Sequence, residues 1–162
     1  MHTPALLRRT AAVLVFVALI LGMSSFRNYR MNAVRVKWTM QLVKLTDTDA
    51  ELRFTAQIPG GWHMFSQTVP DVNGPMPINF EFDASDAYEA VGGTTENGKV
   101  TPVYEPAIDM QVNSLEGQVT YTQKVKLTPG KQPVIRGVIN YMLSNTNELL
   151  PPDEEEITIA VN

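Results

Sequence analysis

The clearest structural signal in this chain is the stretch Val34-Arg35-Val36-Lys37-Trp38-Thr39-Met40-Gln41-Leu42. Apolar and polar residues alternate at every step, which is the two-residue period of a β-strand with one buried face. The alternation resumes over residues 51–58, after Thr46-Asp47-Thr48-Asp49, whose residue types favour turns. The two stretches therefore predict an antiparallel hairpin with Trp38 on its inward face.

Short stretches of the same kind follow along the rest of the chain. They cover residues 62–65, 78–82, 88–91, 119–127, 134–143 and 157–161. Turn residues separate them, as in Pro59-Gly60-Gly61 and Pro129-Gly130, and no stretch has the period of an amphipathic helix. This spacing predicts an all-β protein, an immunoglobulin-like β-sandwich of about eight or nine antiparallel strands.

Three segments interrupt the pattern. Residues 66–77 are rich in Pro, Asn, Asp and Gly and are expected to form a long surface loop. Asn97-Gly98 is a strong signal for a two-residue hairpin turn. Pro102 and Pro106 predict an irregular or edge-like stretch, because proline has no N–H to donate to a neighbouring strand.

The N-terminus has the layout of a secretory signal peptide. Arg8 and Arg9 precede a run over residues 11–23 that is apolar apart from Gly22, and Gly22 and Ser24 supply the small residues of a cleavage site. We therefore expect residues 1–24 to be a Sec-type signal peptide, 25–33 a linker and 34–162 one domain, which would be periplasmic or otherwise exported. The alternative is an uncleaved anchor, since the 17 residues from 10 to 26 are at the lower limit for crossing a bilayer. Contact with a membrane is expected only through this segment.

Composition excludes several classes of function. The chain of 162 residues contains no cysteine, which excludes a redox thiol, a cysteine nucleophile and a thiolate metal site of its own. Removal of residues 1–24 leaves 11 Lys+Arg against 17 Asp+Glu, a net charge of −6. An acidic chain without a basic stripe argues against binding to nucleic acid.

Candidate catalytic and metal-binding residues are few. His63 is the only histidine after residue 2, so a serine hydrolase would have to use it with Ser66 or Ser144, and neither serine lies in a nucleophile-elbow motif. A structural role for His63 is therefore favoured. Asp47, Asp49 and Glu51 lack the glycine and distal glutamate of a calcium loop, and Asp153 to Glu156 are expected to be a solvated acidic run. We predict no metal and no cofactor.

Several segments, in order across 34–162, resemble the N-terminal domain of the thiol:disulfide interchange protein DsbD, also described as the disulfide-bond corrector domain. The segments that carry the resemblance are Val36-Lys37-Trp38, Pro59-Gly60-Gly61-Trp62-His63-Met64-Phe65-Ser66-Gln67, Gly74-Pro75-Met76-Pro77, Tyr121-Thr122-Gln123-Lys124-Val125, Tyr141-Met142-Leu143-Ser144 and Leu150-Pro151-Pro152. The resemblance implies an immunoglobulin-like sandwich. It also implies a lineage that passes reducing equivalents to thioredoxin-like proteins in disulfide isomerisation and cytochrome c maturation.

The resemblance places the family's two reactive cysteines at Ser144 and Leu149 of this chain. Disulfide exchange needs a thiolate that attacks sulfur, and neither side chain can supply one. We therefore expect a stand-alone, redox-inactive relative that is not an enzyme and binds a thioredoxin-like or DsbD-type exported protein. Its docking surface would include Ser144, Leu149 and the 66–77 loop, supported by Trp62 and Phe65, for which core packing is the alternative. Two other functions remain open, a purely structural domain and a hydrolase that uses Ser144 and His63.

Overall fold

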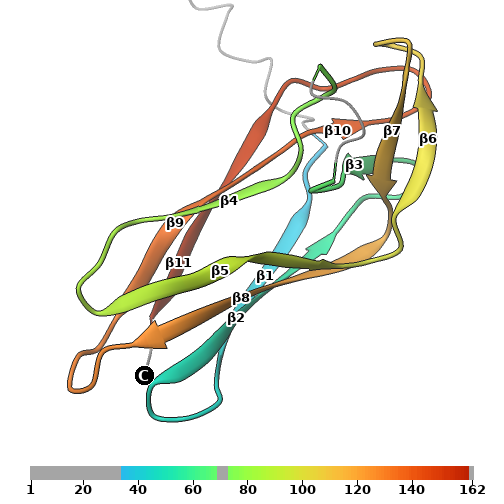
Figure 1. Cartoon of the computed structure of the whole chain (residues 1–162). Coiled ribbons are helices and arrows are strands. Elements are labelled where there is room, and N and C mark those ends of the chain that lie inside the picture. The colour runs from blue at the N-terminus through green and yellow to red at the C-terminus, as the bar shows by residue number, and fades with distance from the viewer. Residues whose placement is uncertain (1–33, 69–72, 161–162) are drawn as a thin grey trace, which may run out of the picture. The chain divides into compact units, whose positions relative to one another are not determined.

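A computed structural model describes residues 34–68 and 73–160. Within these ranges the chain forms eleven strands and no helix, so no helix there is long and apolar enough to cross a membrane. The strands are β1 (Lys37–Lys44), β2 (Asp49–Gln57), β3 (His63–Phe65), β4 (Asn79–Phe82), β5 (Tyr88–Asn97), β6 (Thr101–Glu105), β7 (Met110–Leu115), β8 (Gln118–Leu127), β9 (Val134–Tyr141), β10 (Leu143–Ser144) and β11 (Asp153–Ala160) (Figure 1). The predicted signal peptide and linker lie outside the described residues.

The strands form three antiparallel sheets, ordered β1-β2-β8-β5, β11-β9-β4 and β10-β3-β7-β6. The first two form the two layers of a sandwich, and the third lies at one end of it (Figure 1). The predicted all-β, immunoglobulin-like sandwich is confirmed. It has more strands than the eight or nine expected, because residues 134–143 contribute to two strands, β9 and β10, and because β6 and β7 are additional strands of the third sheet.

The predicted first hairpin is present. β1 and β2 pair from Lys37 opposite Gln57 to Lys44 opposite Ala50. The inward side chains of β2 are fully buried, and the predicted alternation of β8 is also found, with alternate residues from Val119 to Leu127 buried. Local periodicity therefore identified β1, β2 and β8 correctly.

Gln123 is a buried polar residue on the inward face of β8. Its amide nitrogen donates to the carbonyl oxygens of Lys124 (2.9 Å) and Val91 (3.1 Å), and its amide oxygen accepts from the Thr94 hydroxyl (2.9 Å). The register of β5 against β8 shifts between Val91 and Thr95. Gln123 therefore satisfies its own polar atoms by filling the irregularity in β5.

Aromatic rings fill the space between the two layers. Trp38 of β1 packs against Phe80 of β4 (ring centroids 6.5 Å apart), Tyr121 of β8 (6.2 Å) and Tyr141 of β9 (5.9 Å). Phe54 of β2 lies 5.1 Å from Phe80. These contacts join β1, β2 and β8 of one layer to β4 and β9 of the other. Trp38 is therefore on the inward face, as predicted.

Two of these aromatic residues should make the fold sensitive to alkali. Burial, and then the Glu96 carboxylate, raise the pKa of Tyr121 far above its ordinary value of 10.0. Burial raises the pKa of Tyr141 in the same way, with Asp153 the next cause. Above pH 10 the unfolded chain therefore binds fewer protons than the folded protein, and the free energy of unfolding falls as pH rises. We expect a loss of about 1.4 kcal/mol per pH unit for each of the two residues.

The measurement is a paired titration, with tyrosinate absorbance and circular dichroism recorded on the same alkaline series. Ionisation of Tyr121 and Tyr141 should coincide with loss of the β-sheet signal. Complete ionisation of all tyrosines near pH 10, with the β-sheet signal unchanged, would contradict this account.

The prediction of a two-residue hairpin at Asn97-Gly98 is wrong. β5 pairs with β8, whereas β6 pairs with β7 in another sheet, so the chain crosses between sheets at this point. A Cβ added to Gly98 would lie 2.8 Å from the Val119 Cγ1 and 3.0 Å from the Leu115 Cδ2 atom. Gly98 therefore lies close to side chains of the core, a position that the dipeptide alone does not distinguish from a hairpin turn.

The segments around the prolines and near the C-terminus also differ from expectation. The stretch containing Pro102 forms β6, an edge strand, in agreement with the edge-like alternative. The single late strand expected over residues 134–143 is instead divided at Met142 into β9 and β10, which belong to different sheets. This division places Ser144 in the third sheet, which carries the candidate site.

Candidate functional site

Ser144 and Leu149 face each other as a backbone pair at the base of a short loop. They form an antiparallel β-bridge, flanked by hydrogen bonds from Asn145 N to Glu148 O (3.0 Å) and from Leu150 N to Leu143 O (2.9 Å). This pattern defines a non-hydrogen-bonded pair, in which the Cα atoms are about 4.5 Å apart and both side chains project to the same side. The structure thus brings together the two positions that the resemblance selects.

The loop between these two residues is held by its own hydrogen bonds. The Asn145 side-chain oxygen accepts from the backbone N–H groups of Asn147 (2.7 Å) and Glu148 (2.9 Å). Thr146, Asn147 and Glu148 are exposed, whereas Ser144 is completely buried and Leu149 partly buried. The sequence therefore builds a small, ordered and exposed loop on a buried base.

Below the loop lies a buried carboxylate that the sequence analysis did not select. The Ser144 hydroxyl donates to Glu105 Oε2 at 2.5 Å, and His63 Nε2 lies 3.4 Å from the same oxygen. Glu105 is only 2 % exposed. It follows Val103 at the inward positions of β6, so an acid at an inward strand position was the available signal. Its position between Pro102 and Pro106 obscured that signal.

These contacts do not have the arrangement of a serine hydrolase. In a catalytic triad the histidine lies between the serine and the acid, whereas here Glu105 lies between Ser144 and His63. The other candidate nucleophile, Ser66, is buried and donates to Glu96 at 2.7 Å. Both serines are thus hydrogen-bond donors to carboxylates.

Trp62 and Phe65 lie on either side of His63 in the sequence but differ in burial. Phe65 is completely buried, and its ring meets the His63 ring edge-on at 5.8 Å, so it can support the site only from beneath. Trp62 is partly buried, and its backbone N–H donates to Pro59 O at 3.1 Å in the turn before β3. Trp62 therefore lies nearer the surface of the two.

The beginning of the 66–77 loop is attached to the sandwich. Gln67 N donates to Glu96 Oε2 at 3.0 Å, and the Asn113 amide donates to Thr68 O at 2.9 Å. Residues 69–72 of this loop lie outside the described part of the chain. The Glu96 carboxylate, which binds both Ser66 and Gln67, is a second residue that the sequence analysis missed.

The acidic residues of the β1–β2 turn are used for local structure. The Asp49 carboxylate accepts from the Thr46 hydroxyl at 2.9 Å, and Glu51 pairs with Arg53 at 3.0 Å. In the described residues, no group of three or more His, Asp or Glu side chains is arranged to hold a metal ion.

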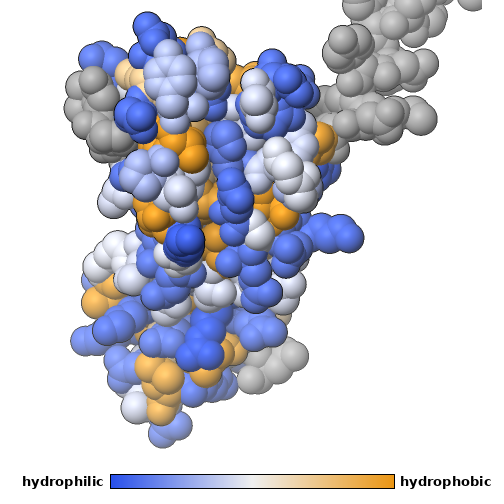
Figure 2. All heavy atoms as spheres, turned by 90° about the vertical axis from the view of Figure 1, so that its right-hand side faces the viewer, coloured by the Kyte–Doolittle hydropathy of each residue, from blue (hydrophilic) through white to orange (hydrophobic). Residues whose placement is uncertain are grey.

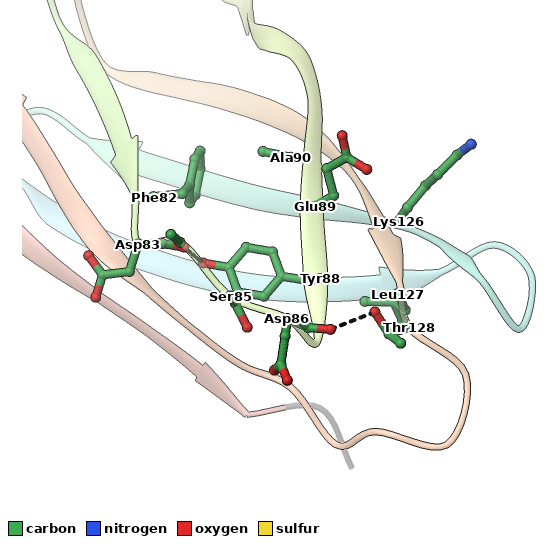
Figure 3. A pocket seen from close by; sticks show the side chains of 11 residues that line it. Phe82, Asp83, Ser85, Asp86, Tyr88, Glu89, Ala90, Lys126, Leu127 and Thr128 are labelled. Atoms are coloured by element: carbon green, nitrogen blue, oxygen red, sulfur yellow. Dashed lines mark hydrogen bonds between the residues drawn. The ribbon is translucent and has the colours of Figure 1, made fainter.

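A hollow of about 520 Å³ lies at the junction of β4, β5 and the end of β8, and is lined by none of the predicted site residues (Figure 3). Several of its polar groups form local hydrogen bonds or an ion pair. The Tyr88 hydroxyl donates to Asp83 O at 2.6 Å, the Thr128 hydroxyl donates to Asp86 O at 2.9 Å, and the Asp86 carboxylate pairs with Lys131. These contacts hold the connection between β4 and β5, which joins the two layers, so the hollow is a structural feature of this connection.

The fold belongs to the class of immunoglobulin-like sandwiches. Comparison with known proteins shows which members of this class it resembles. No protein-family model and no curated protein matches the chain. Among solved structures, the reduced N-terminal domain of DsbD from Neisseria meningitidis matches with a TM-score of 0.50 and 15 % identity, over 77 % of this chain and 86 % of that one. The N-terminal periplasmic domain of ScsB from Proteus mirabilis matches with a TM-score of 0.60 and 10 % identity, over 78 % of this chain and 47 % of that one.

A structure of the complex between the DsbD and PilB N-terminal domains from N. meningitidis also matches, with a TM-score of 0.47 and 14 % identity, over 77 % of this chain and 84 % of that one. The chain spans just under half of the ScsB domain. The domain has a DsbD N-terminal-like fold, as the sequence resemblance predicted, and it has no cysteine.

Proposed function

We propose that this domain is an exported protein-binding module, related to periplasmic thiol:disulfide interchange and cytochrome c maturation, which docks on a thioredoxin-like or DsbD-type protein without exchanging disulfides. The observation that carries the proposal is the pairing of Ser144 with Leu149 beneath an exposed, ordered loop. An ordered loop loses little conformational entropy when it binds, which favours a role in recognition. Without cysteine, such binding is non-covalent.

The surface around the third sheet is compatible with a reversible contact. Figure 2 shows the side of the domain on which β6 and β7 lie, where apolar residues form small patches separated by hydrophilic side chains. Non-obligate interfaces have this mixed character, whereas permanent ones are more apolar. The fold likeness to a periplasmic domain supports an exported location.

The test is isothermal titration of the protein with exported thioredoxin-like proteins from the same organism. Each partner is used in its reduced form, in its oxidised form and with both active-site cysteines replaced by serine. At least one partner should bind, with the same affinity in all three forms. Leu149→Ala should weaken that binding about tenfold, the effect of losing one well-buried contact. Leu45→Ala, which truncates the exposed Leu45 of the β1–β2 turn, is the matched control and should have no effect.

Absence of binding to every partner would reject the proposal in favour of a purely structural domain. Covalent labelling of Ser144 by a serine-reactive phosphonate would instead support the hydrolase. Binding only to the reduced partner would contradict the predicted contact, which does not depend on the redox state of the partner.

The exported location leads to a prediction about the N-terminus. The mature protein should begin near Ser25, because the signal sequence ends with small residues at Gly22 and Ser24. Mass spectrometry of the protein from a membrane-free periplasmic extract checks this. Recovery of the intact chain from the membrane fraction alone would favour the anchor.

A further inference from the structure

Three segments that are separate in the sequence converge on the Glu105 carboxylate. The first is the β6–β7 turn, whose Ala107 N–H donates to Glu105 Oε1 at 3.3 Å. The second is β10, through the Ser144 hydroxyl at 2.5 Å, and the third is β3, through His63 Nε2 at 3.4 Å. Glu105 therefore contacts the base of the Ser144–Leu149 loop, the strand that follows Trp62, and its own turn.

Strand pairing does not connect the turn end of the β6–β7 hairpin, where Glu105 lies, to β3 or β10. β7 pairs with β3 only through Leu115 and Ser114, which are at the opposite end of the hairpin from Glu105. β10 pairs with β3 but not with β6. Glu105 lies at the tip of this hairpin and accepts a hydrogen bond from β10. It thus joins β6 and β10, the two outer strands of the sheet.

Burial of the Glu105 carboxylate costs free energy, which indicates that this residue does more than fill space in the core. A buried charged group loses its hydration, and an apolar side chain of similar size would often give equal or greater stability. Glu105 recovers the loss through directed hydrogen bonds, which determine where its partners lie. Ser144 is suited to this contact, because a hydroxyl is a stronger hydrogen-bond donor than the thiol of a cysteine in the same place.

We propose that Glu105 is a positioning residue that connects the β6–β7 turn to the Ser144–Leu149 loop by hydrogen bonds and so preorganises the surface that the partner contacts. This connection does not depend on a partner, whereas its effect on affinity rests on the proposed docking function. In this chain a hydrogen bond between a serine and a carboxylate organises the loop that a cysteine pair would otherwise close.

The test is hydrogen exchange of the full exported chain, measured by mass spectrometry over residues 106–109 and 145–150. Glu105→Ala should reduce protection in both segments by about tenfold to a hundredfold, the equivalent of a lost hydrogen bond to a charged group. Glu105→Gln keeps an acceptor for Ser144 and should restore most of the protection. Glu116→Ala, which removes an exposed acid just after β7, is the control and should leave both segments unchanged.

Ser144→Ala provides a second route to the same result if Glu105→Ala does not fold, because it removes the donor to Glu105. It also removes the longer contacts of the hydroxyl with Asn145 O (3.3 Å) and Glu148 O (3.2 Å), so the exchange of the turn is the decisive readout. Ser144→Ala should release the turn over residues 106–109 as well as its own loop. Release of the loop without any change in the turn, or unchanged exchange in both segments, would overturn the proposal whether or not a partner is known.

Titration with the partner separates this inference from the function on which it rests. If the wild-type protein binds and Glu105→Ala binds about tenfold more weakly, with Glu105→Gln close to wild type, preorganisation is supported. If wild type and Glu105→Ala bind equally, the inference fails and the docking function stands. If the wild type does not bind, the docking function fails and the exchange measurement still decides whether Glu105 makes this connection.

Discussion

Trp38→Ala is expected to lower the free energy of unfolding by about 3 kcal/mol or more, the usual cost of removing a large aromatic side chain from a core. The Trp38 ring contacts Phe80, Tyr121 and Tyr141, and so joins both layers of the sandwich. Its partial exposure places the expected loss near the lower end of the range for tryptophan. A loss of this size is a large part of the free energy of unfolding of an ordinary domain, which is roughly 5–15 kcal/mol.

The matched control is Lys37→Ala, on the opposite face of β1, where the lysine is exposed. It should change the free energy of unfolding by about 0.5 kcal/mol or less. Urea unfolding followed by circular dichroism gives both values without depending on tryptophan fluorescence. Equal losses in the two variants would mean that the ring cluster around Trp38 is not the core of the sandwich.

Gly137→Ala should be at least as damaging, although it adds only one carbon atom. A Cβ at this position of β9 would overlap the carbonyl oxygen of Glu81 and come within 3.1 Å of the Phe82 Cα atom. Both obstacles belong to the backbone of β4, so no side-chain rotation can relieve them. β4 is paired only with β9, and its displacement would also move Phe80 out of the aromatic cluster. We expect a loss of about 3 kcal/mol, the upper part of the range for overpacking.

Gly93→Ala is the control for this substitution. Gly93 lies within β5, and a Cβ added there would meet no atom within 4 Å. The variant should be neutral or more stable by up to about 1 kcal/mol, because alanine restricts the unfolded chain. Thermal and urea unfolding of the two variants provide the comparison. A Gly137→Ala protein as stable as Gly93→Ala would contradict the close approach of β4 to β9.

The strands β1, β2 and β8 could be predicted because their signal is local, whereas only the first part of β5 and the second part of β11 were expected to be strands. Alternation along β1, β2 and β8 depends only on which side chains face the core. The inward faces of β2 and β8 are buried as expected, and that of β1 is partly buried. Pairing of strands depends on contacts between distant residues, which a periodic pattern does not encode. The predictions missed the division of the late strand at Met142 and the crossover at Gly98, because both features depend on strand pairing.

The candidate site was predictable only in part, for the same reason. Ser144 and Leu149 were found through a resemblance, and their backbone pairing follows from the short polar segment between them. Glu105 is distant from both in the sequence, and it becomes their neighbour only when the β6–β7 hairpin reaches β10. Its one local signal, an acid at an inward strand position, was concealed by the prolines on either side.

The most direct measurement concerns the two positions assigned to the cysteine pair. In the double variant Ser144→Cys/Leu149→Cys, the backbones already form a non-hydrogen-bonded pair, with Cα atoms about 4.5 Å apart, at the short end of the range that a disulfide spans. The folded variant should form an intramolecular disulfide in air. Thiol labelling is carried out in denaturant, because position 144 is completely buried in the fold, and it should detect no free thiol before reduction and both cysteines after it. The single variants Ser144→Cys and Leu149→Cys should be labelled both before and after reduction. Two thiols that remain free in a folded, oxidant-treated double variant would contradict the assignment of Ser144 and Leu149 to the cysteine positions.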